Sequence, residues 1–264
     1  GLGMGFSGTG NRITTTLHQY HVIDTPALRQ SLIEFLEKQT AICFDTETTS
    51  IDAMQAELVG LAFCYRTNEA YYVPVPPDRV EAQRIVDEFR PVLENPNTQK
   101  IGQNIKYDLI VLKHYGVEVR GPLFDTMLAH YLIEPEGRHN MDILAENYLN
   151  YTPVSIEELI GKKGKNQLTM REVPVEQVAE YAAEDADVTW QLRDVFAPKL
   201  QADGLEKLFR EVETPLVPVL ADIEHAGVRV DVAALRELSQ TLEGDLRGLE
   251  ERIHQMAGQS FNIS

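Results

Sequence analysis

Two acidic residues two positions apart form the first candidate site in the sequence. Asp45 and Glu47 lie in the segment FDTET, directly after the apolar, β-rich run AIC. Side chains two apart in a strand point to the same side, so both carboxylates project together where this strand ends. They repel each other unless a proton or a cation intervenes, and at neutral pH a divalent metal ion is the usual partner. The alternative is a turn-capping Asp45 beside a solvent-facing Glu47.

Two further pairs of polar residues have the four-residue spacing that places side chains on one face of a helix. Asn104 and Asp108 lie in GQNIKYD, where a predicted strand gives way to a helix. Tyr181 and Asp185 lie in YAAEDADVT, inside a long predicted helix. The alternatives are a helix N-cap with a solvated first-turn acid for the first pair, and a half-buried helix tyrosine for Tyr181. We expect Asp187, on a different helix face, to be solvated.

The three elements occur in a defined order: D-x-E on a strand, N-x-x-x-D at the start of a helix and Y-x-x-x-D on a late helix. Together with the segments FDTETTSID, FDTM and KGKNQLT, they resemble the 3′-to-5′ proofreading exonuclease domain of family-A DNA polymerases, the bacterial DNA polymerase I family. The tyrosine places the resemblance in the tyrosine-bearing subgroup of the DEDD exonucleases. The similarity runs from about Leu17 to the end of the chain.

The resemblance implies a role for five residues on a ribonuclease H-like fold. The metal-binding carboxylates would be Asp45, Glu47, Asp108 and Asp185. They would hold two divalent ions, Mg²⁺ or Mn²⁺ with Zn²⁺ as an option at one site, about 4 Å apart, to stabilise the attacking and leaving oxygens of a phosphoryl displacement. Asp45 would contact both ions, Glu47 and Asp185 would complete the tighter site, and Asp108 would hold the second ion. The Tyr181 hydroxyl would position the attacking water.

The resemblance also implies contacts with a single-stranded or frayed 3′ end of DNA. It places Ile51 and the loop near Ile156 against the last bases, and Gln103 and Asn104 at the DNA or behind the metal ligands. Ile156 stands where the family often carries an aromatic residue. Because a stacked base contributes about 1 to 3 kcal/mol, end binding is expected to be weaker here.

A basic segment, GKKGKNQLTMR, is the candidate for contacts with the DNA backbone. It contains Lys162, Lys163, Lys165 and Arg171 and no acidic residue, so it could follow phosphates. The alternative is a solvated surface loop. The net charge of −17 argues against a nucleic-acid partner at first sight. Screening over about 10 Å limits that objection, and bound metal ions would reverse the local charge.

Length and composition favour a globular intracellular protein. The 264 residues, 43% of them apolar, can bury a sizeable core. No apolar run is long enough for a transmembrane helix and no secretory leader opens the chain, so we expect a cytoplasmic, nucleoid-associated protein without a membrane partner. Cys43 and Cys64 lie in strand-like runs and are expected to be buried thiols rather than disulfide or zinc ligands. A monomer is the default.

The order of the predicted elements favours an α/β fold, with a mixed sheet flanked by helices. Expected strands cover residues 41–45, 57–66, 70–75 and a short stretch near 99–102. Expected helices cover residues 26–38, 80–94, 104–115, 124–134, 140–149, 155–160, 174–197, 205–226 and 232–257.

The expected domain organisation follows from changes in composition and in predicted helix length along the chain. Residues 1–16 are rich in Gly, Ser and Thr and are expected to be a disordered or artificially added leader. Residues 17–204 would form the exonuclease domain. Residues 205–264, with two long amphipathic helices, resemble the truncated start of a polymerase domain. We therefore expect the natural chain to continue past its last residue, and the polymerase active site to be absent from this segment.

Two other functions share much of this pattern. A ribonuclease D-like RNA exonuclease would have the same four carboxylates and tyrosine, although the C-terminal helices resemble a polymerase thumb. A catalytically silent domain that supports a polymerase would retain the fold but lose its acidic residues, whereas all of them are present here.

Overall fold

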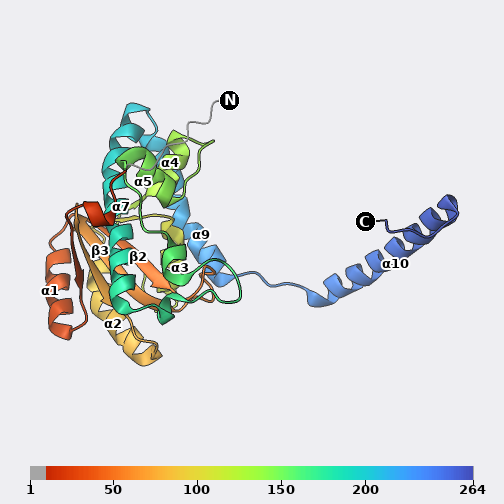
Figure 1. Cartoon of the computed structure of the whole chain (residues 1–264), viewed down its shortest axis with the longest axis horizontal. Helices are drawn as coiled ribbons and strands as arrows, with labels where there is room; N and C mark the ends of the chain where they lie inside the picture. Colours follow the sequence, from red (N-terminus) through yellow and green to blue (C-terminus); the bar gives the residue numbers. More distant parts are fainter. Residues whose placement is uncertain (1–9, 264) are drawn as a thin grey trace. The chain divides into compact units, whose positions relative to one another are not determined.

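A computed structural model describes residues 10–263, which contain a mixed six-stranded sheet with helices on both faces (Figure 1). The strand order is β1-β4-β3-β2-β5-β6. Strands β2, β3 and β4 are antiparallel neighbours, whereas the pairs β1–β4, β2–β5 and β5–β6 are parallel. The bounds are Gln19–Val22 (β1), Ala41–Thr48 (β2), Leu58–Arg66 (β3), Glu69–Pro74 (β4), Gln99–Gly102 (β5) and Leu123–Asp125 (β6). This arrangement confirms the predicted α/β class.

The helices form two layers because alternate residues of each strand point to opposite faces of the sheet. Ile42 and Phe44 of β2 face a core shared with α1, α2, α3 and α9, whereas Cys43 faces a core shared with α4, α5 and α7. The bounds are Pro26–Leu36 (α1), Arg79–Leu93 (α2), Ile105–Lys113 (α3), Thr126–Ile133 (α4), Met141–Leu149 (α5), Ile156–Ile160 (α6), Val175–Ala202 (α7), Glu206–Leu208 (α8), Thr214–Ala226 (α9) and Val232–Ala257 (α10), with 3₁₀ turns at Ile13–Thr15 and Met170–Glu172.

Three elements differ from the sequence-based expectation. Strand β1 was not predicted, because this four-residue edge strand alternates between exposed and half-buried positions and pairs only with β4. The start of the helix expected over residues 124–134 is strand β6, and helix α4 begins only after Asp125 caps it. The helix expected over residues 205–226 is divided by a π-helical segment, Phe209–Glu213.

The expected leader of residues 1–16 is only partly described. Its first nine residues lie outside the described part of the chain. The remainder contacts the domain: the Asn11 N–H donates to the Asn150 carbonyl (3.0 Å), and the Thr152 N–H donates to the Asn11 carbonyl (2.9 Å). This part of the expected leader is therefore in contact with the domain.

The chain divides into two compact units, with the boundary after His225. Helix α9 begins in the first unit, where Val217 and Ala221 are buried in the core beside α3. The second unit contains α10, and none of the residues described in this helix is buried. Its leucines, from Leu235 to Leu249, are more than half exposed.

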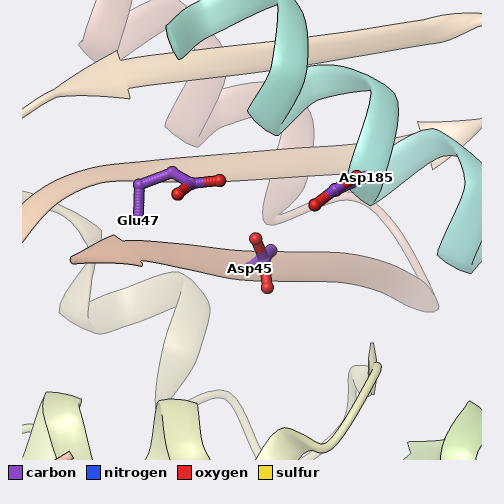
Figure 2. Close-up of side chains that lie close together, drawn as sticks. All are labelled: Asp45, Glu47 and Asp185. Atoms are coloured by element: carbon purple, nitrogen blue, oxygen red, sulfur yellow. The ribbon is translucent and has the colours of Figure 1, made fainter. Parts of the chain in front are cut away.

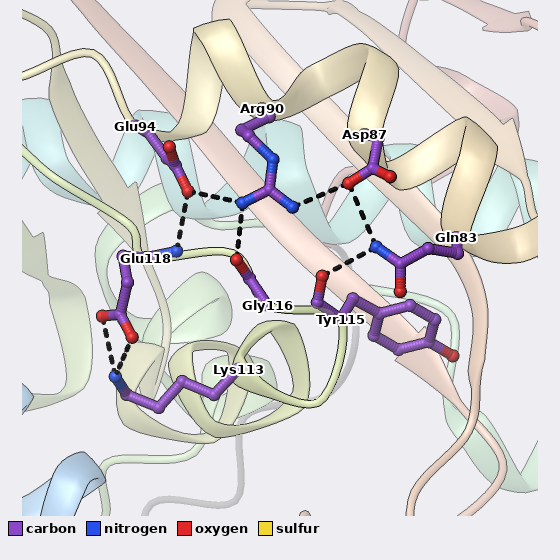
Figure 3. A network of polar contacts seen from close by, with 8 residues as sticks. All are labelled: Gln83, Asp87, Arg90, Glu94, Lys113, Tyr115, Gly116 and Glu118. Atoms are coloured by element: carbon purple, nitrogen blue, oxygen red, sulfur yellow. Dashed lines mark hydrogen bonds and ion pairs between the residues drawn. The ribbon is translucent and has the colours of Figure 1, made fainter.

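A polar network fastens helix α3 to α2 (Figure 3). Arg90 of α2 forms ion pairs with Asp87 (2.7 Å) and Glu94 (2.9 Å) and also donates to the Gly116 carbonyl in the turn after α3. The Glu118 N–H donates to Glu94 (3.0 Å). These contacts fix the C-terminal end of α3, and so help to fix the helix that carries Asp108.

The two cysteines lie in the core of the domain. Cys43 and Cys64 are free and fully buried, as predicted. They lie opposite each other on β2 and β3. Across the described residues, no helix combines the length and apolar character needed to span a membrane.

Gly60 leaves the space that the Tyr72 ring fills in the sheet beside the acidic pair. It lies opposite Glu47 on β3, and a Cβ at this position would overlap the ring of Tyr72, which is 1% exposed. Gly60→Ala should therefore lower the free energy of unfolding by about 1 to 3 kcal/mol, as overpacked cores do. Thermal unfolding followed by circular dichroism measures the loss.

Gly248→Ala is the control for that substitution. Gly248 lies in α10, and no other side chain or distant backbone atom lies within 4 Å of the position that a Cβ would occupy. Alanine should therefore leave the first unit's melting temperature unchanged and favour the helix by about 1 kcal/mol. Equal melting temperatures for Gly60→Ala and the wild type would contradict the packing described here.

Candidate active site

Strand β2 presents Asp45 and Glu47 on the face of the sheet covered by α7 (Figure 2). The two side chains share this face because they are two residues apart in the strand. The pairing of β2 with β3 shifts register between Glu47 and Thr48, so a bulge ends the regular ladder directly beside the acidic pair. Such bulges re-aim side chains at functional sites.

Helix α7 brings Asp185 to the same point. Ala182, Ala183 and Ala186 are fully buried, and their small side chains allow the helix to pack closely on the sheet. One carboxylate oxygen from each of Asp45, Glu47 and Asp185 lies within 4.8 Å of the others. The geometry is that of a pocket of oxygen ligands for a cation.

The electrostatics of this cluster favour a positively charged occupant. Burial raises the pKa of Asp45 to about 7, and burial together with the charges of Asp45 and Asp108 raises the pKa of Glu47 well above its usual value. The pKa of Asp185 is raised by burial first, then by Asp45 and Glu47. Its Oδ1 atom is buried without a hydrogen-bond partner among residues 10–263. A metal ion would satisfy that oxygen and relieve the repulsion.

Asp108 lies beside this cluster but is held differently. It is 2% exposed, and its Oδ1 accepts hydrogen bonds from the Thr46 backbone N–H (2.9 Å) and hydroxyl. Thr46 points to the opposite face of β2 from its two acidic neighbours, so α3 delivers Asp108 from the other side of the strand. Burial and the charge of Asp45 nevertheless raise the pKa of Asp108 well above its usual value. Neither bond uses Oδ2, and Asp108 is not among the three residues whose carboxylate oxygens converge.

Tyr181 lies one helical turn before Asp185 on α7, as the spacing predicted. Burial raises the pKa of the Tyr181 hydroxyl, and the charges of Asp185, Glu47 and Asp45 raise it further. The hydroxyl is therefore subject to the charge of all three carboxylates and remains protonated at neutral pH. It can donate a hydrogen bond to an oxygen at the cluster and accept one from a water.

The start of α3 is organised by Asp125, whose role the sequence did not reveal. Its carboxylate accepts the backbone N–H groups of Asn104 (3.1 Å) and Ile105 (2.9 Å), and also those of Met127 (2.9 Å) and Leu128 (3.2 Å). One buried carboxylate thus caps both α3 and α4. Asn104 adopts a left-handed conformation with φ 54° and makes no side-chain cap bond, which leaves its amide exposed.

The remaining predicted DNA contacts lie in different environments. Ile51 is 95% exposed and Ile156, at the first position of α6, is 42% exposed. The Gln103 amide is occupied within the protein, because it donates to the His139 carbonyl (2.8 Å) and accepts from the Thr126 hydroxyl. All three lysines of the basic segment, Lys162, Lys163 and Lys165, are exposed.

Arg171 differs from the role expected for it. Its guanidinium donates to the backbone carbonyls of Val75 (2.8 Å) and Leu58 (2.7 Å), which joins the 3₁₀ turn Met170–Glu172 to the sheet. Both terminal nitrogens are therefore engaged inside the domain rather than directed at a phosphate.

Two buried acids of α7 were missed or misplaced by the sequence analysis. Asp187 was expected to be solvated but is 2% exposed, and it accepts hydrogen bonds from the Tyr20 hydroxyl and the Asn68 N–H, each at 2.9 Å. Glu184 is fully buried and accepts hydrogen bonds from the Tyr151 hydroxyl and the Val154 N–H. Every residue from Ala182 to Thr189 is buried, and the alanines and Val188 of this stretch carried the missed signal, since small and apolar side chains on several faces of a helix indicate burial on several faces.

Comparison with known proteins establishes the family. A family model described as a 3′-5′ exonuclease matches residues 20–201. The chain belongs to this 3′-5′ exonuclease family. The chain is also similar to proteins named DNA polymerase I: it is 39% identical over 254 residues to the protein of Pseudomonas aeruginosa and 38% identical over 246 residues to the protein of Rhizobium leguminosarum. These alignments cover 92% and 84% of this chain but 28% and 24% of the relatives.

Solved structures share the fold of this exonuclease domain. The POL domain of Pol1 from M. smegmatis, in complex with DNA primer-template and dNTP, gives a TM-score of 0.74 at 21% identity over 92% of this chain and 38% of that chain. Brucella melitensis NrnC gives a TM-score of 0.61 at 24% identity over 79% of this chain and 93% of that one. The resemblance inferred from the motifs is confirmed at the level of family and fold.

The raised pKa values of the acidic cluster should make the stability of the metal-free domain depend on pH. A carboxyl group whose folded pKa is raised binds protons more tightly in the folded than in the unfolded chain, so stability falls as pH rises from about 4 through the folded pKa. With EDTA present, the melting temperature of the wild type should therefore fall between pH 5 and pH 8, across the pKa of Asp45 at about 7. Mn²⁺ at pH 8 should reverse the fall.

Asp45→Asn tests the cause of that fall. Removing one repelling charge should raise the metal-free free energy of unfolding at pH 8 by about 1 kcal/mol or more, and should remove most of the stabilisation by Mn²⁺. Calorimetric melting curves of both proteins across the pH range give the comparison. A variant that melts like the wild type at every pH, with or without metal, would show that the cluster is not under electrostatic strain.

Proposed function

We propose that this exonuclease domain removes nucleotides from the 3′ end of DNA by two-metal-ion hydrolysis, as the proofreading part of a DNA polymerase active in replication and repair. The observation that carries the proposal is the convergence of Asp45, Glu47 and Asp185, from two distant parts of the chain, within 4.8 Å. The names of the relatives favour DNA over RNA as the substrate.

The residues present fit hard divalent cations such as Mg²⁺ or Mn²⁺. All the donors are carboxylate oxygens, the type of ligand these ions prefer, and the Oδ1 atom of Asp185 is buried without a hydrogen-bond partner among the described residues. Asp45, Glu47 and Asp185 would hold one ion. Asp45 and the Oδ2 atom of Asp108 would hold the second, with Asp108 oriented by Thr46. Two such ions supply charge stabilisation to the attacking and leaving oxygens of phosphoryl transfer.

The chain's own groups would orient the reactants. The protonated Tyr181 hydroxyl, close to Asp185 and Glu47, would bind the attacking water and aim it at the terminal phosphodiester. Exclusion of bulk water by the packing of α7 on the sheet would strengthen these electrostatic interactions. Positioning and electrostatic stabilisation of this kind account for most of the catalysis of phosphoryl transfer.

Exposed side chains would hold the end of the strand. Ile51 and Ile156 offer apolar surface to the terminal bases, and the exposed amide of Asn104 offers hydrogen bonds. The exposed lysines of the basic segment offer positive charge to the phosphates, a contribution that should weaken with salt. The remainder of the polymerase chain would deliver the frayed 3′ end to this surface.

Digestion of a 5′-labelled single-stranded DNA oligonucleotide with Mg²⁺ or Mn²⁺ tests the proposal, run beside an EDTA sample and a matching RNA oligonucleotide. We expect a metal-dependent ladder that shortens from the 3′ end of DNA and is abolished in Asp45→Ala, which should remain folded. Full cleavage by Asp45→Ala would contradict the assignment of the site. Preferential digestion of RNA would instead make the domain a ribonuclease D-like enzyme.

Tyr181→Phe separates water positioning from metal binding. Loss of the hydroxyl should lower kcat by about a hundredfold, the scale of a misplaced reactant, while Mn²⁺ still raises the melting temperature as in the wild type. Tyr65→Phe is the control, because the Tyr65 hydroxyl contacts only that of Tyr71 among the described residues. An undiminished kcat in Tyr181→Phe would remove the tyrosine from the mechanism.

A further inference from the structure

Glu184 is a buried carboxylate for which the reaction described above has no use. It is 0% exposed, and each of its two oxygens accepts a hydrogen bond from the same short segment of chain. Oε1 accepts from the Tyr151 hydroxyl, and Oε2 accepts from the Val154 N–H at 2.8 Å. Burying a carboxylate is costly unless its oxygens are paired in this way, so the arrangement holds the segment firmly.

The segment that Glu184 holds leads directly to a proposed DNA contact. Val154 is followed by Ser155, which caps α6 by accepting the Glu157 N–H, and then by Ile156. Only Ser155 separates Val154, whose backbone N–H is bound by Glu184, from Ile156, whose side chain is exposed. The position of Ile156 therefore depends on the position of the Glu184 carboxylate.

Glu184 is also the immediate neighbour of Asp185 on α7. Both residues lie in the interior of a 28-residue helix, where the backbone between them is fixed by helical hydrogen bonds. The connection from the metal-ligand cluster to Ile156 thus consists of the helical peptide between Asp185 and Glu184, the Glu184 carboxylate, and the Val154 N–H that it binds.

We propose that Glu184 is a positioning residue that holds Ile156 at a fixed distance from the metal ligands, where its side chain can bind the 3′-terminal base. This inference rests on the proposed function, in which Ile156 contacts the last bases. A terminal base seated against Ile156 would then bring its phosphodiester to the cluster of Asp45, Glu47 and Asp185. Without the Glu184 carboxylate, the start of α6 would lose this anchor, while Leu159 and Ile160 at its other end still pack against the core and the metal ligands keep their positions.

Asp187 provides a matched comparison on the same helix. It is equally enclosed, at 2% exposure, and accepts three hydrogen bonds, from the Tyr20 hydroxyl, the Asn68 N–H and the Gln191 side-chain amide. These partners lie on β1, in the turn between β3 and β4, and on α7 itself. Loss of Asp187 should therefore destabilise the fold about as much as loss of Glu184, without releasing α6.

Steady-state digestion of a single-stranded DNA oligonucleotide by the full 264-residue chain separates the two roles. In Glu184→Ala we expect KM to rise about tenfold with kcat nearly unchanged, the pattern of lost substrate binding. In Asp187→Ala, with a comparable fall in melting temperature, KM should stay within about twofold of the wild type. Glu184→Gln should recover much of the loss, because its amide oxygen can still accept the Val154 N–H.

Combining the substitutions at Glu184 and Ile156 tests whether Glu184 acts on DNA binding through Ile156. Ile156→Ala should raise KM in the wild-type background but have little further effect in Glu184→Ala, because the side chain is then no longer held in place. Amide hydrogen exchange across residues 151–160 should be faster in Glu184→Ala and unchanged in Asp187→Ala. This second measurement does not depend on activity.

Three results would overturn the inference: additive effects of the two alanine substitutions, equal rises of KM in Glu184→Ala and Asp187→Ala, or unchanged hydrogen exchange over residues 151–160. Each of these results leaves the proposed function standing if the wild type digests DNA. Absence of digestion by the wild type would count against the proposed function itself, whereas the exchange measurement would still decide whether Glu184 holds α6.

Discussion

Mutual repulsion among enclosed carboxylates is the constraint on which this domain is built. Asp45, Glu47 and Asp185 share one small volume, Asp108 lies beside it, and burial raises the pKa of all four. A fold that placed these groups together without a cation would gain stability by separating or protonating them. The surrounding structure must therefore hold the carboxylates in place. The match to a 3′-5′ exonuclease family gives the reason for such an arrangement, because a nuclease site can use a cluster of carboxylates.

Helix α7 supplies most of that constraint, because its polar side chains point inward in several directions. Asp185 and Tyr181 face the acidic cluster, Glu184 faces the segment before α6, and Asp187 faces β1 and the turn between β3 and β4. Alanines at the intervening positions allow close approach to the sheet. The helix is thus fixed by hydrogen bonds on the faces turned away from the acidic cluster, which keeps Asp185 in position against the repulsion.

The sequence predicted the parts of this site that depend on local spacing. Residues two apart on β2 and four apart on α7 share a face whatever the rest of the fold does, so spacing alone paired Asp45 with Glu47 and Tyr181 with Asp185. The family resemblance, not spacing, joined the two pairs in one site. The mixed sheet and most helix positions followed from the same periodicities. The π-helical interruption after α8 leaves no comparable periodic signal.

Features that depend on distant partners could not be predicted in this way. Asp187 is buried because Tyr20 and Asn68 reach it from β1 and from the turn after β3, and Asp125 caps α3 because β6 ends beside it. Arg171 turns inward to two backbone carbonyls rather than outward to a phosphate. In each case the deciding group is supplied by a part of the chain that local spacing does not identify.

Equilibrium binding of Mn²⁺, followed by the electron paramagnetic resonance signal of the free ion at pH 8, tests the central claim most directly. The account predicts that the wild type removes Mn²⁺ from solution, that Asp45→Asn and Asp185→Asn largely abolish this binding, and that Asp194→Asn, an exposed acid on α7, does not. Binding that survives both cluster substitutions, or that is lost equally in the control, would contradict it.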